Sequence, residues 1–253
     1  MIDYEKRGAV GVITINRPEA KNAVNGDVAE GIEAAIDQLE DDDSVFVGII
    51  TGAGDVFCAG ADLKAINSGD AARLNTERGG FGGITNRERV KPIIAAVDGP
   101  ALAGGCEIVL ACDLVVASTN ARFGVPEVKR SLVAAAGGLF RLGRKLPRNI
   151  AMELIVTGDP ISAERAHGFG LVNELVGPGE ALAAAEALAQ RICANAPVAV
   201  RESRKVALAA TDADDSIGWK MSMEAMGVAM SSADFSEGLT AFIEKRDPQW
   251  TGR

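Results

Sequence analysis

Apolar residues along this chain follow two alternating periods, one typical of buried strands and one typical of amphipathic helices. Residues 45–51 (VFVGIIT), 92–99 (PIIAAVDG) and 113–118 (DLVVAS) are nearly uninterrupted apolar runs, as expected of parallel strands that are buried on both faces. Residues 8–15 (GAVGVITI) predict a further strand. Residues 27–40 instead space their apolar side chains three and four positions apart, which predicts a helix. This alternation predicts an α/β fold.

The pattern changes in two places. Strand and helix alternate to about residue 175, but residues 67–90 are polar and glycine-rich, which predicts a loop or short helix close to a site. After the turn at residue 197 no strand pattern returns, and the chain reads as helices only. We therefore expect a core over residues 1–195 and a helical C-terminal region over residues 196–253.

Composition narrows the class of protein. The 253 residues are 47% hydrophobic, enough for a large core, but only 4% aromatic, so that core must be aliphatic. No run approaches the roughly 20 apolar residues of a membrane-spanning helix. The N-terminus lacks the apolar segment and cleavage site of a signal peptide. The net charge of −9 argues against nucleic acid or an anionic membrane as a partner.

Cysteine and histidine usage argues against a metal site. Cys58, Cys106, Cys112 and Cys193 show no metal-binding spacing, and His167 is the only histidine, in a segment where we expect a structural role. A zinc site would need clustered ligands, so we expect no metal. Free thiols are typical of a reducing compartment, which predicts a cytoplasmic protein.

Residues 99–118 (GPALAGGCEIVLACDLVVAS) place the carboxylate of Glu107 in a segment that otherwise reads as a buried helix followed by a buried strand. Gly104 and Gly105 let a ligand approach the backbone closely at the helix start, where the first N–H groups have no partner within the helix. Such a corner favours a partly negative oxygen. Acidic residues also favour first turns for dipole reasons alone, which is the alternative explanation for Glu107.

Two other stretches offer matching chemistry. Residues 54–66 (GDVFCAGADLKAI) follow a strand with small residues, so the N–H of Ala61 is a candidate second donor of the pair that stabilises an enolate or oxyanion. Glu127 lies among apolar residues, although a surface carboxylate paired with Lys129 or Arg130 is the alternative. Two carboxylates in apolar surroundings have raised pKa values and suit general acid and base roles.

Five motifs in order identify a family: INRPEAKNAV, FCAGADLKAI, GPALAGGCEIVLACD, FGVPEVKRSL and GGLFRL. Together they resemble the crotonase (enoyl-CoA hydratase/isomerase) superfamily, over essentially the whole chain. The resemblance implies a spiral of ββα units with a helical C-terminal region used for trimer assembly. It also implies acyl-CoA thioester substrates of lipid metabolism and no metal or redox cofactor, because coenzyme A is part of the substrate. A homotrimer or a dimer of trimers is the expected assembly.

The resemblance also assigns site residues. It places the oxyanion-hole donors on Ala61 and Gly104, and the two glutamates that hydratases use on Glu107 and Glu127. The positions that match contacts to coenzyme A are Ala20, Lys21, Asp62, Leu63, Lys64, Phe242 and Lys245, of which the last two belong to a tail that approaches a neighbouring subunit's ligand.

Because both glutamates are present, we expect an enoyl-CoA hydratase that adds water across the double bond of a 2-enoyl-CoA through an enolate. The alternatives within the family are a double-bond isomerase or an enzyme like carnitinyl-CoA dehydratase, whose tail EKRDPQWTGR resembles. A non-catalytic acyl-CoA-binding protein is the alternative of another class. Compared with the family's hydratases, three places differ, and all are expected to make the surroundings of Glu127 more apolar: Val125, Ala134-Ala135 and Leu139-Phe140.

Overall fold

The computed structural model describes all residues from Met1 to Arg253. Its main feature is a six-stranded sheet in the order β1-β2-β3-β6-β8-β11, in which only β1 runs antiparallel to its neighbour. The strands are β1 (Ile2–Arg7), β2 (Val10–Ile15), β3 (Val47–Gly52), β6 (Ile93–Val97), β8 (Leu114–Ser118) and β11 (Glu174–Val176). Since the strands cross the sheet in chain order, each turn of the chain adds one strand beside the previous one.

A second, smaller sheet in the order β10-β9-β7 collects one short strand from each of three successive turns. These strands are β7 (Ala101–Leu102), β9 (Arg122–Gly124) and β10 (Ile161–Ser162), and β4 (Asn75–Thr76) pairs with β5 (Gly80–Phe81) in a separate hairpin. A strand of the main sheet, a strand of the second sheet and a helix thus recur along the chain. This recurrence is the spiral of ββα units that the sequence predicts.

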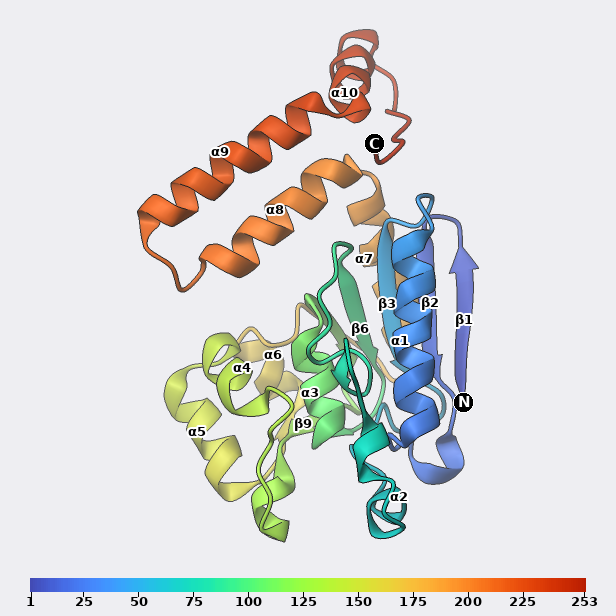
Figure 1. Cartoon of the computed structure of the whole chain (residues 1–253), viewed down its shortest axis with the longest axis vertical. Coiled ribbons are helices and arrows are strands. Elements are labelled where there is room, and N and C mark those ends of the chain that lie inside the picture. Colours follow the sequence, from blue (N-terminus) through green and yellow to red (C-terminus); the bar gives the residue numbers. More distant parts are fainter.

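Helices cover both faces of the main sheet, which explains why its strands are apolar without interruption (Figure 1). Ile50 points into the larger part of the core with Ile32 and Ile36 of α1 (Gly26–Asp41). Its neighbour Ile49 points to the other face, where it packs with Ala185 of α7 (Ala181–Cys193). Successive side chains of a strand point to opposite faces, so only a strand buried on both sides requires isoleucine at both positions.

The remaining helices are short, except for three at the C-terminus. They are η1 (Pro18–Ala20), α2 (Leu63–Asn67), η2 (Ala71–Leu74), α3 (Gly104–Ala111), η3 (Pro126–Arg130), α4 (Gly138–Lys145), α5 (Arg148–Thr157) and α6 (Ala163–Gly168). α3 is buried along nearly its whole length. It therefore carries its first turn into the interior, where the candidate site forms.

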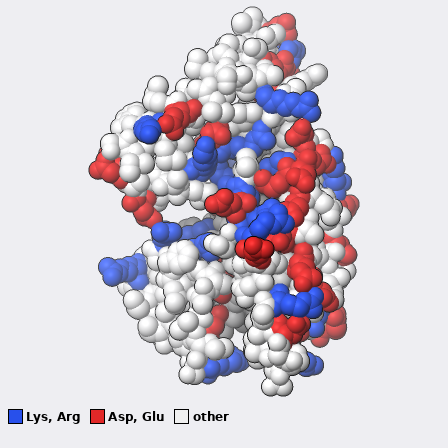
Figure 2. Space-filling model, viewed as in Figure 1, with Lys and Arg blue, Asp and Glu red and all other residues white.

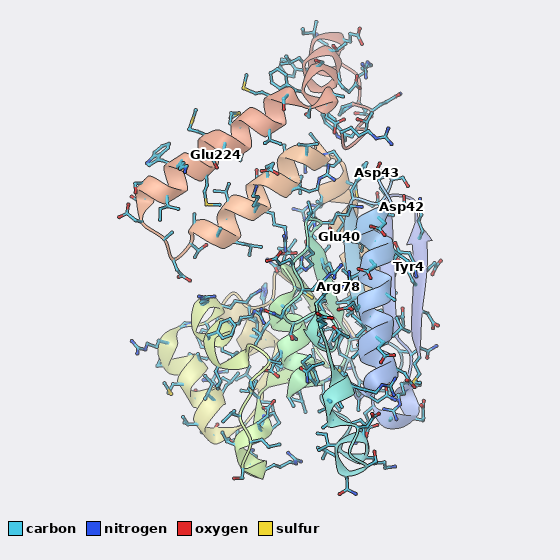
Figure 3. All side chains as sticks on the ribbon, in the orientation of Figure 1. Tyr4, Glu40, Asp42, Asp43, Arg78 and Glu224 are labelled. Atoms are coloured by element: carbon cyan, nitrogen blue, oxygen red, sulfur yellow. The ribbon has the colours of Figure 1, made fainter.

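α8 (Pro197–Ala210), α9 (Asp215–Ser231) and α10 (Ala233–Glu244) form a helical arm that projects from the sheet (Figure 1). Arg204 of α8 joins the arm to the core, because it donates to the carboxylate of Asp113 at 2.8 Å and to the carbonyl oxygen of Arg89 at 2.8 Å. At the end of α1, Asp42 and Asp43 face this side of the molecule (Figure 3), and Asp43 pairs with Arg253 of the C-terminus. No helix combines the length and apolar character that crossing a bilayer requires.

Most predicted elements are confirmed, and the exceptions are informative. The strand expected over residues 8–15 begins at Val10, and the helix over residues 27–40 and the C-terminal helices are present. β1 is missed by the sequence, because only Ile2 and Tyr4 of its six residues are shielded from solvent and the others are exposed. Residues 67–90 contain a short helix, as expected, and also the β4–β5 hairpin, which the sequence did not predict.

Candidate active site

The strand-to-helix corner before α3 carries an unpartnered backbone donor. β7 ends at Leu102, the chain reverses at Ala103 with φ 52° and ψ −129°, and α3 begins at Gly104. The segment that contains Ala61 runs beside this corner: Leu102 N–H donates to the Cys58 carbonyl at 3.0 Å. The N–H groups of Ala61 and Gly104 donate to no acceptor of the chain, and both residues line one cavity. Two donors from separate segments therefore face the same space.

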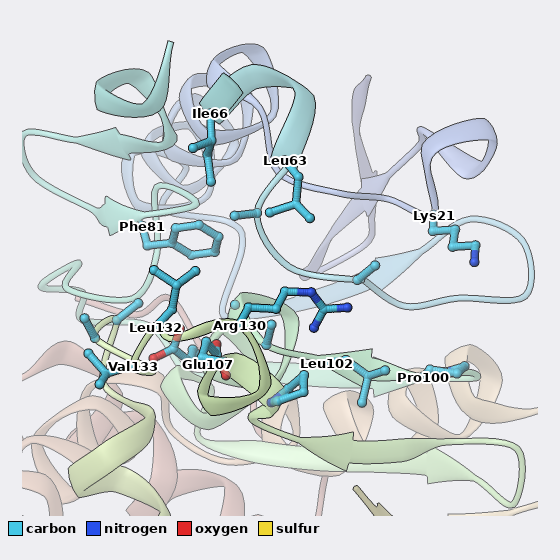
Figure 4. Close-up of a pocket in the computed structure, with 18 of the residues that line it drawn as sticks. Lys21, Leu63, Ile66, Phe81, Pro100, Leu102, Glu107, Arg130, Leu132 and Val133 are labelled. Carbon is cyan, nitrogen blue, oxygen red and sulfur yellow. The ribbon is translucent and has the colours of Figure 1, made fainter. Parts of the chain in front are cut away.

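That cavity has a volume of about 590 Å³, which suits a small-molecule ligand (Figure 4). Phe81, Leu132 and Val133 gather at one end of it, whereas Lys21 lies toward the other end (Figure 4). The side chain of Arg130 extends between the two ends. Further lining residues are Val56, Ala59, Ala61, Leu63, Ile66, Asn75, Pro100, Leu102, Ala103, Gly104, Glu107, Pro126, Glu127, Ala135 and Ala136.

Glu107 is nearly buried in the first turn of α3, with 3% of its surface exposed. Its Oε1 atom accepts a hydrogen bond from Gly138 N–H at 2.9 Å. The pKa of the carboxyl is raised to about 7, mainly by burial and also by the negative charge of the nearby Glu127. The hydrogen bond from Gly138 acts in the opposite direction. A carboxyl with this pKa holds and releases a proton at neutral pH, which suits a general acid or base.

Glu127 comes from a different element, η3, and is half-buried. Its Oε2 atom is buried and has no hydrogen-bond partner in the chain. Burial raises the pKa of this carboxyl as well, and the charge of Arg130 acts against that shift. An unpartnered buried oxygen costs free energy for the fold, so it points to a bound group that the site is built to contact.

The structure therefore brings Ala61, Gly104, Glu107 and Glu127 to one cavity from segments far apart in sequence. The two N–H groups provide a place for a developing negative charge on a carbonyl oxygen. The two carboxyls beside them provide proton transfer. The combination suits chemistry at the carbons next to a thioester or similar carbonyl group.

The residues expected to contact coenzyme A separate into three groups. Lys21 and Leu63 line the cavity, and Ala20 and Lys64 are their immediate chain neighbours. Asp62 does not line the cavity; its side chain pairs with Arg17 at 2.7 Å and caps α2 by accepting from Lys64 N–H.

Phe242 and Lys245 lie on and just after α10, in the arm, and line no part of this cavity. Phe242 is 85% exposed. Within a single chain these two residues do not belong to the site.

The three departures from the hydratase pattern differ in where they lie. Val125 is buried beside Gly138, and Ala135 lines the cavity, so both make the surroundings of Glu127 apolar as expected. Leu139 and Phe140 are exposed on the outside of α4 and do not line the cavity, so the expectation is wrong for them.

The sequence also missed Phe81 and Leu132 as lining residues; only the polar, glycine-rich character of residues 67–90 indicated that Phe81 was near a site.

The fold and the cavity together match a known family. The enoyl-CoA hydratase/isomerase family profile matches residues 5–253, and the chain belongs to this family. It is 42% identical to a short-chain-enoyl-CoA hydratase of Clostridium acetobutylicum over 250 residues, covering 96% of this chain and 94% of the relative. It is 38% identical to a carnitinyl-CoA dehydratase of Proteus mirabilis over 255 residues, 98% of this chain and 97% of the relative.

A solved structure resembles it equally closely. The crystal structure of an enoyl-CoA hydratase from Mycobacterium tuberculosis superposes with a TM-score of 0.96 at 48% identity, covering 100% of this chain and 99% of that one. The resemblance that the motifs indicate, to the crotonase superfamily, is thus confirmed for the family and for the α/β fold.

Proposed function

We propose that this chain is an enoyl-CoA hydratase, which adds water across the double bond of a 2-enoyl-CoA. The observation that carries the proposal is the meeting of two raised-pKa carboxyls, Glu107 and Glu127, with the free N–H groups of Ala61 and Gly104 in one cavity. The thioester oxygen accepts from the two N–H groups, which stabilise the enolate that forms when water attacks. The proposal needs no metal or redox cofactor, because the N–H groups stabilise the negative charge and the carboxyls transfer the protons. Coenzyme A is part of the substrate.

The carboxyls account for the protons of the reaction. A water held between Glu107 and Glu127 gives its oxygen to the β-carbon and one proton to an ionised carboxylate. The enolate then takes one proton at the α-carbon from the other, protonated carboxyl. Oxygen and hydrogen are thus added to the two carbons of the double bond. The two carboxyls have then exchanged protonation states, and a proton passes back between them before the next turnover.

The lining of the cavity favours a plain acyl chain over a charged one. The end beside Phe81 is lined by Leu132 and Val133 (Figure 4), and Ala136 is a further apolar lining residue of the cavity. A substrate that carries a quaternary ammonium group, such as a carnitinyl thioester, is typically bound by several aromatic rings, and Phe81 is the only aromatic residue that lines this cavity. We therefore favour a short, unsubstituted enoyl group, with the carnitinyl-CoA dehydratase reaction as the second candidate because of the relative in Proteus mirabilis.

Crotonyl-CoA tests the proposal directly. The purified wild type is expected to remove the enoyl absorbance, and Glu107→Gln and Glu127→Gln are each expected to lower kcat by about 10²–10⁴-fold while leaving KM nearly unchanged. The double variant is expected to lose far less than the product of the two effects, because the pair acts as a unit. Full activity in Glu107→Gln together with loss in Glu127→Gln would favour an isomerase. Tight binding of crotonyl-CoA without turnover would favour a non-catalytic binding protein.

We further propose that the chain assembles as a trimer or a dimer of trimers through its helical arm. Large apolar side chains of α9 and α10 are exposed in the single chain: Trp219 (72%), Met223 (67%), Met226 (56%), Met230 (53%), Phe242 (85%) and Ile243 (78%). So many large apolar side chains exposed on neighbouring helices are typical of a protein interface. In such an assembly Phe242 and Lys245 approach the cavity of a neighbouring subunit. The four free cysteines, three of them buried, favour a cytoplasmic location.

A further inference from the structure

The backbone segment that holds Glu107 is bonded from its other side by Arg141 of α4. Gly138 N–H donates to Glu107 Oε1 at 2.9 Å. Two residues earlier, the carbonyl of Ala136 accepts from Arg141 Nη1 at 3.2 Å, and Arg141 Nη2 donates to the carbonyl of Thr85 at 2.7 Å. Residues 136–138 therefore lie between the carboxyl and the guanidinium, with a hydrogen bond on each side.

The Arg141 head group lies directly against Gly137, the residue between the two hydrogen-bonded positions. Gly137 has a φ of 111°, which side chains rarely adopt, and a Cβ atom there would overlap Arg141 Nη1. The guanidinium thus packs directly on the peptide that precedes Gly138. A shift of the Arg141 head group would therefore be transmitted to the Gly138 N–H that Glu107 accepts.

Arg141 is not bound to any carboxylate that would explain its position. No salt bridge of the chain includes Arg141. It lines a second cavity of about 600 Å³, which Arg144 and Lys145 also line. Lysine and arginine side chains gather in this region between the arm and the core (Figure 2). Arg141 is half-buried, donates its hydrogen bonds to carbonyl groups and lies 5.1 Å from the centroid of the Phe140 ring, with Arg144 and Arg89 close enough to disfavour its charge. Its positive charge lowers the pKa of Glu107, against the larger effect of burial.

We propose that Arg141 is a positioning residue for the proposed hydration: it fixes residues 136–138 so that Gly138 N–H orients the Glu107 carboxyl toward the cavity. Arg141 lines the second cavity and not the first, so it acts only through the segment and through its charge. The charged groups that act on Glu107 are Glu127 of η3 and Arg141 of α4, while Arg130 and Lys21 line the same cavity. This inference rests on the proposed function.

Three variants separate positioning from charge and from plain stability. Arg141→Gln removes both the charge and the two-carbonyl contact, whereas Arg141→Lys keeps the charge but its single Nζ does not reproduce the fork that bonds both carbonyls. Arg144→Gln is the matched control. Arg144 lies three residues after Arg141 in the same helix, and its guanidinium lies over the same Phe140 ring, 5.3 Å from the centroid against 5.1 Å for Arg141. It pairs with Asp212 and does not bond residues 136–138.

Kinetics on crotonyl-CoA give the first readout. For Arg141→Gln we expect kcat to fall about 10–100-fold, the effect of a small misplacement of a catalytic group, with KM changed less than about threefold. The limb of the pH profile that belongs to Glu107, near pH 7, is expected to move upward, because a neighbouring cation is lost. Arg141→Lys is expected to lower kcat and to move that limb upward by less than Arg141→Gln does, because it keeps the charge but loosens the Gly138 N–H that also lowers the pKa of Glu107. Arg144→Gln is expected to match the wild type in both.

A titration that needs no turnover gives the second readout. The carboxyl of Glu107 is followed by carbon NMR in protein labelled at glutamate, with Glu107→Gln as the assignment control. An upward shift in Arg141→Gln supports the inference even if the wild type does not hydrate crotonyl-CoA, in which case only the proposed function fails. A titration and a kcat in Arg141→Gln that equal those of Arg144→Gln would overturn it. If Arg141→Gln does not fold, an unchanged kcat in Arg141→Lys overturns it instead.

Discussion

At the scale of single residues, Glu107 is held in surroundings that disfavour its ionised form. The pKa of its carboxyl is about 7 in the folded chain, against an ordinary value of 4.5. Between pH 4.5 and 7 the unfolded chain therefore ionises this group more readily than the folded chain does, which lowers the free energy of unfolding. The native state is fully stabilised by this group below about pH 4.5 and loses that contribution as pH rises through 7. Glu107→Gln, which stays neutral, is therefore expected to raise the free energy of unfolding by at most about 3 kcal/mol at pH 8. Urea denaturation at pH 5 and pH 8 measures the difference.

A surface carboxylate provides the control for that experiment. Glu153 of α5 is exposed and pairs with Arg165 at 2.7 Å, which lowers its pKa. Glu153→Gln is expected to leave stability unchanged or slightly lower at pH 8, the opposite direction from Glu107→Gln. A Glu107→Gln variant that is less stable than the wild type at pH 8 would show that the carboxylate is not strained by burial.

Gly104 supports a second prediction at this scale. A Cβ atom at Gly104 would overlap the Cε1 and Cζ atoms of the Phe81 ring, which lines the same cavity. Gly104→Ala is therefore expected to displace the ring or turn the peptide that donates its N–H. Loss of one oxyanion donor costs about 3 kcal/mol of barrier, so kcat on crotonyl-CoA is expected to fall at least a hundredfold.

The double variant Gly104→Ala/Phe81→Ala separates the two causes, because it removes the overlap but keeps the added methyl group beside the donor. Melting temperature and kcat are measured on the same samples. Compared with Phe81→Ala alone, the double variant is expected to have nearly the same kcat, because the overlap that turns the donor peptide is gone; a kcat that stays low would assign the loss to the added methyl group. An unchanged kcat in the single variant would remove Gly104 from the site.

At the scale of elements, the start of α3 stores backbone strain next to the reacting groups. Ala103 adopts φ 52° and ψ −129°, a backbone conformation that residues other than glycine rarely adopt and that costs them about 1–3 kcal/mol. Glycine would remove that strain at an entropic cost of about 0.5–1 kcal/mol. Ala103→Gly is therefore expected to stabilise the protein by about 1 kcal/mol in urea denaturation. Ala29→Gly, inside α1, should instead destabilise it by about 1 kcal/mol or more. Equal losses in both variants would contradict strain at Ala103.

The same scale shows why sequence reasoning reached some elements and not others. Strands such as β3 and β6 are buried on both faces, so their composition alone identifies them. β7 and β10 have two residues each, too few for any period to appear. The hydrophobic pattern also predicts nothing about which segments meet. That Phe81 lies against Gly104 follows from the path of the β4–β5 hairpin across α3, a contact between positions more than twenty residues apart.

At the scale of the whole molecule, the site forms where successive turns of the spiral lie side by side. Ala61 follows β3, Gly104 follows β7 and Glu127 follows β9, so three turns each contribute a group at the same edge. Local chemistry made all three residues candidates, and the resemblance to the family assigned their roles. The ion pair of Asp62 was not predicted: its partner Arg17 lies 45 positions away, and nothing in the local sequence of either residue indicates the pair.

Assembly through the arm is the prediction that belongs to this scale. Trp219 and Met223 lie one helical turn apart on α9 and are 72% and 67% exposed. Burying each in a contact between subunits stabilises the assembly by about 1.5–3 kcal/mol. Trp219→Glu/Met223→Glu removes that gain and places two charges in an apolar contact, so subunit affinity is expected to fall at least a hundredfold.

Met152→Glu is the matched control, because Met152 is 50% exposed but lies on α5 of the core. Light scattering at micromolar concentration should give a trimer or hexamer for the wild type and the control, and a smaller species for the double variant. A monomeric wild type would contradict the proposal. If Phe242 and Lys245 reach a neighbour's cavity, dissociation should also raise KM for crotonyl-CoA.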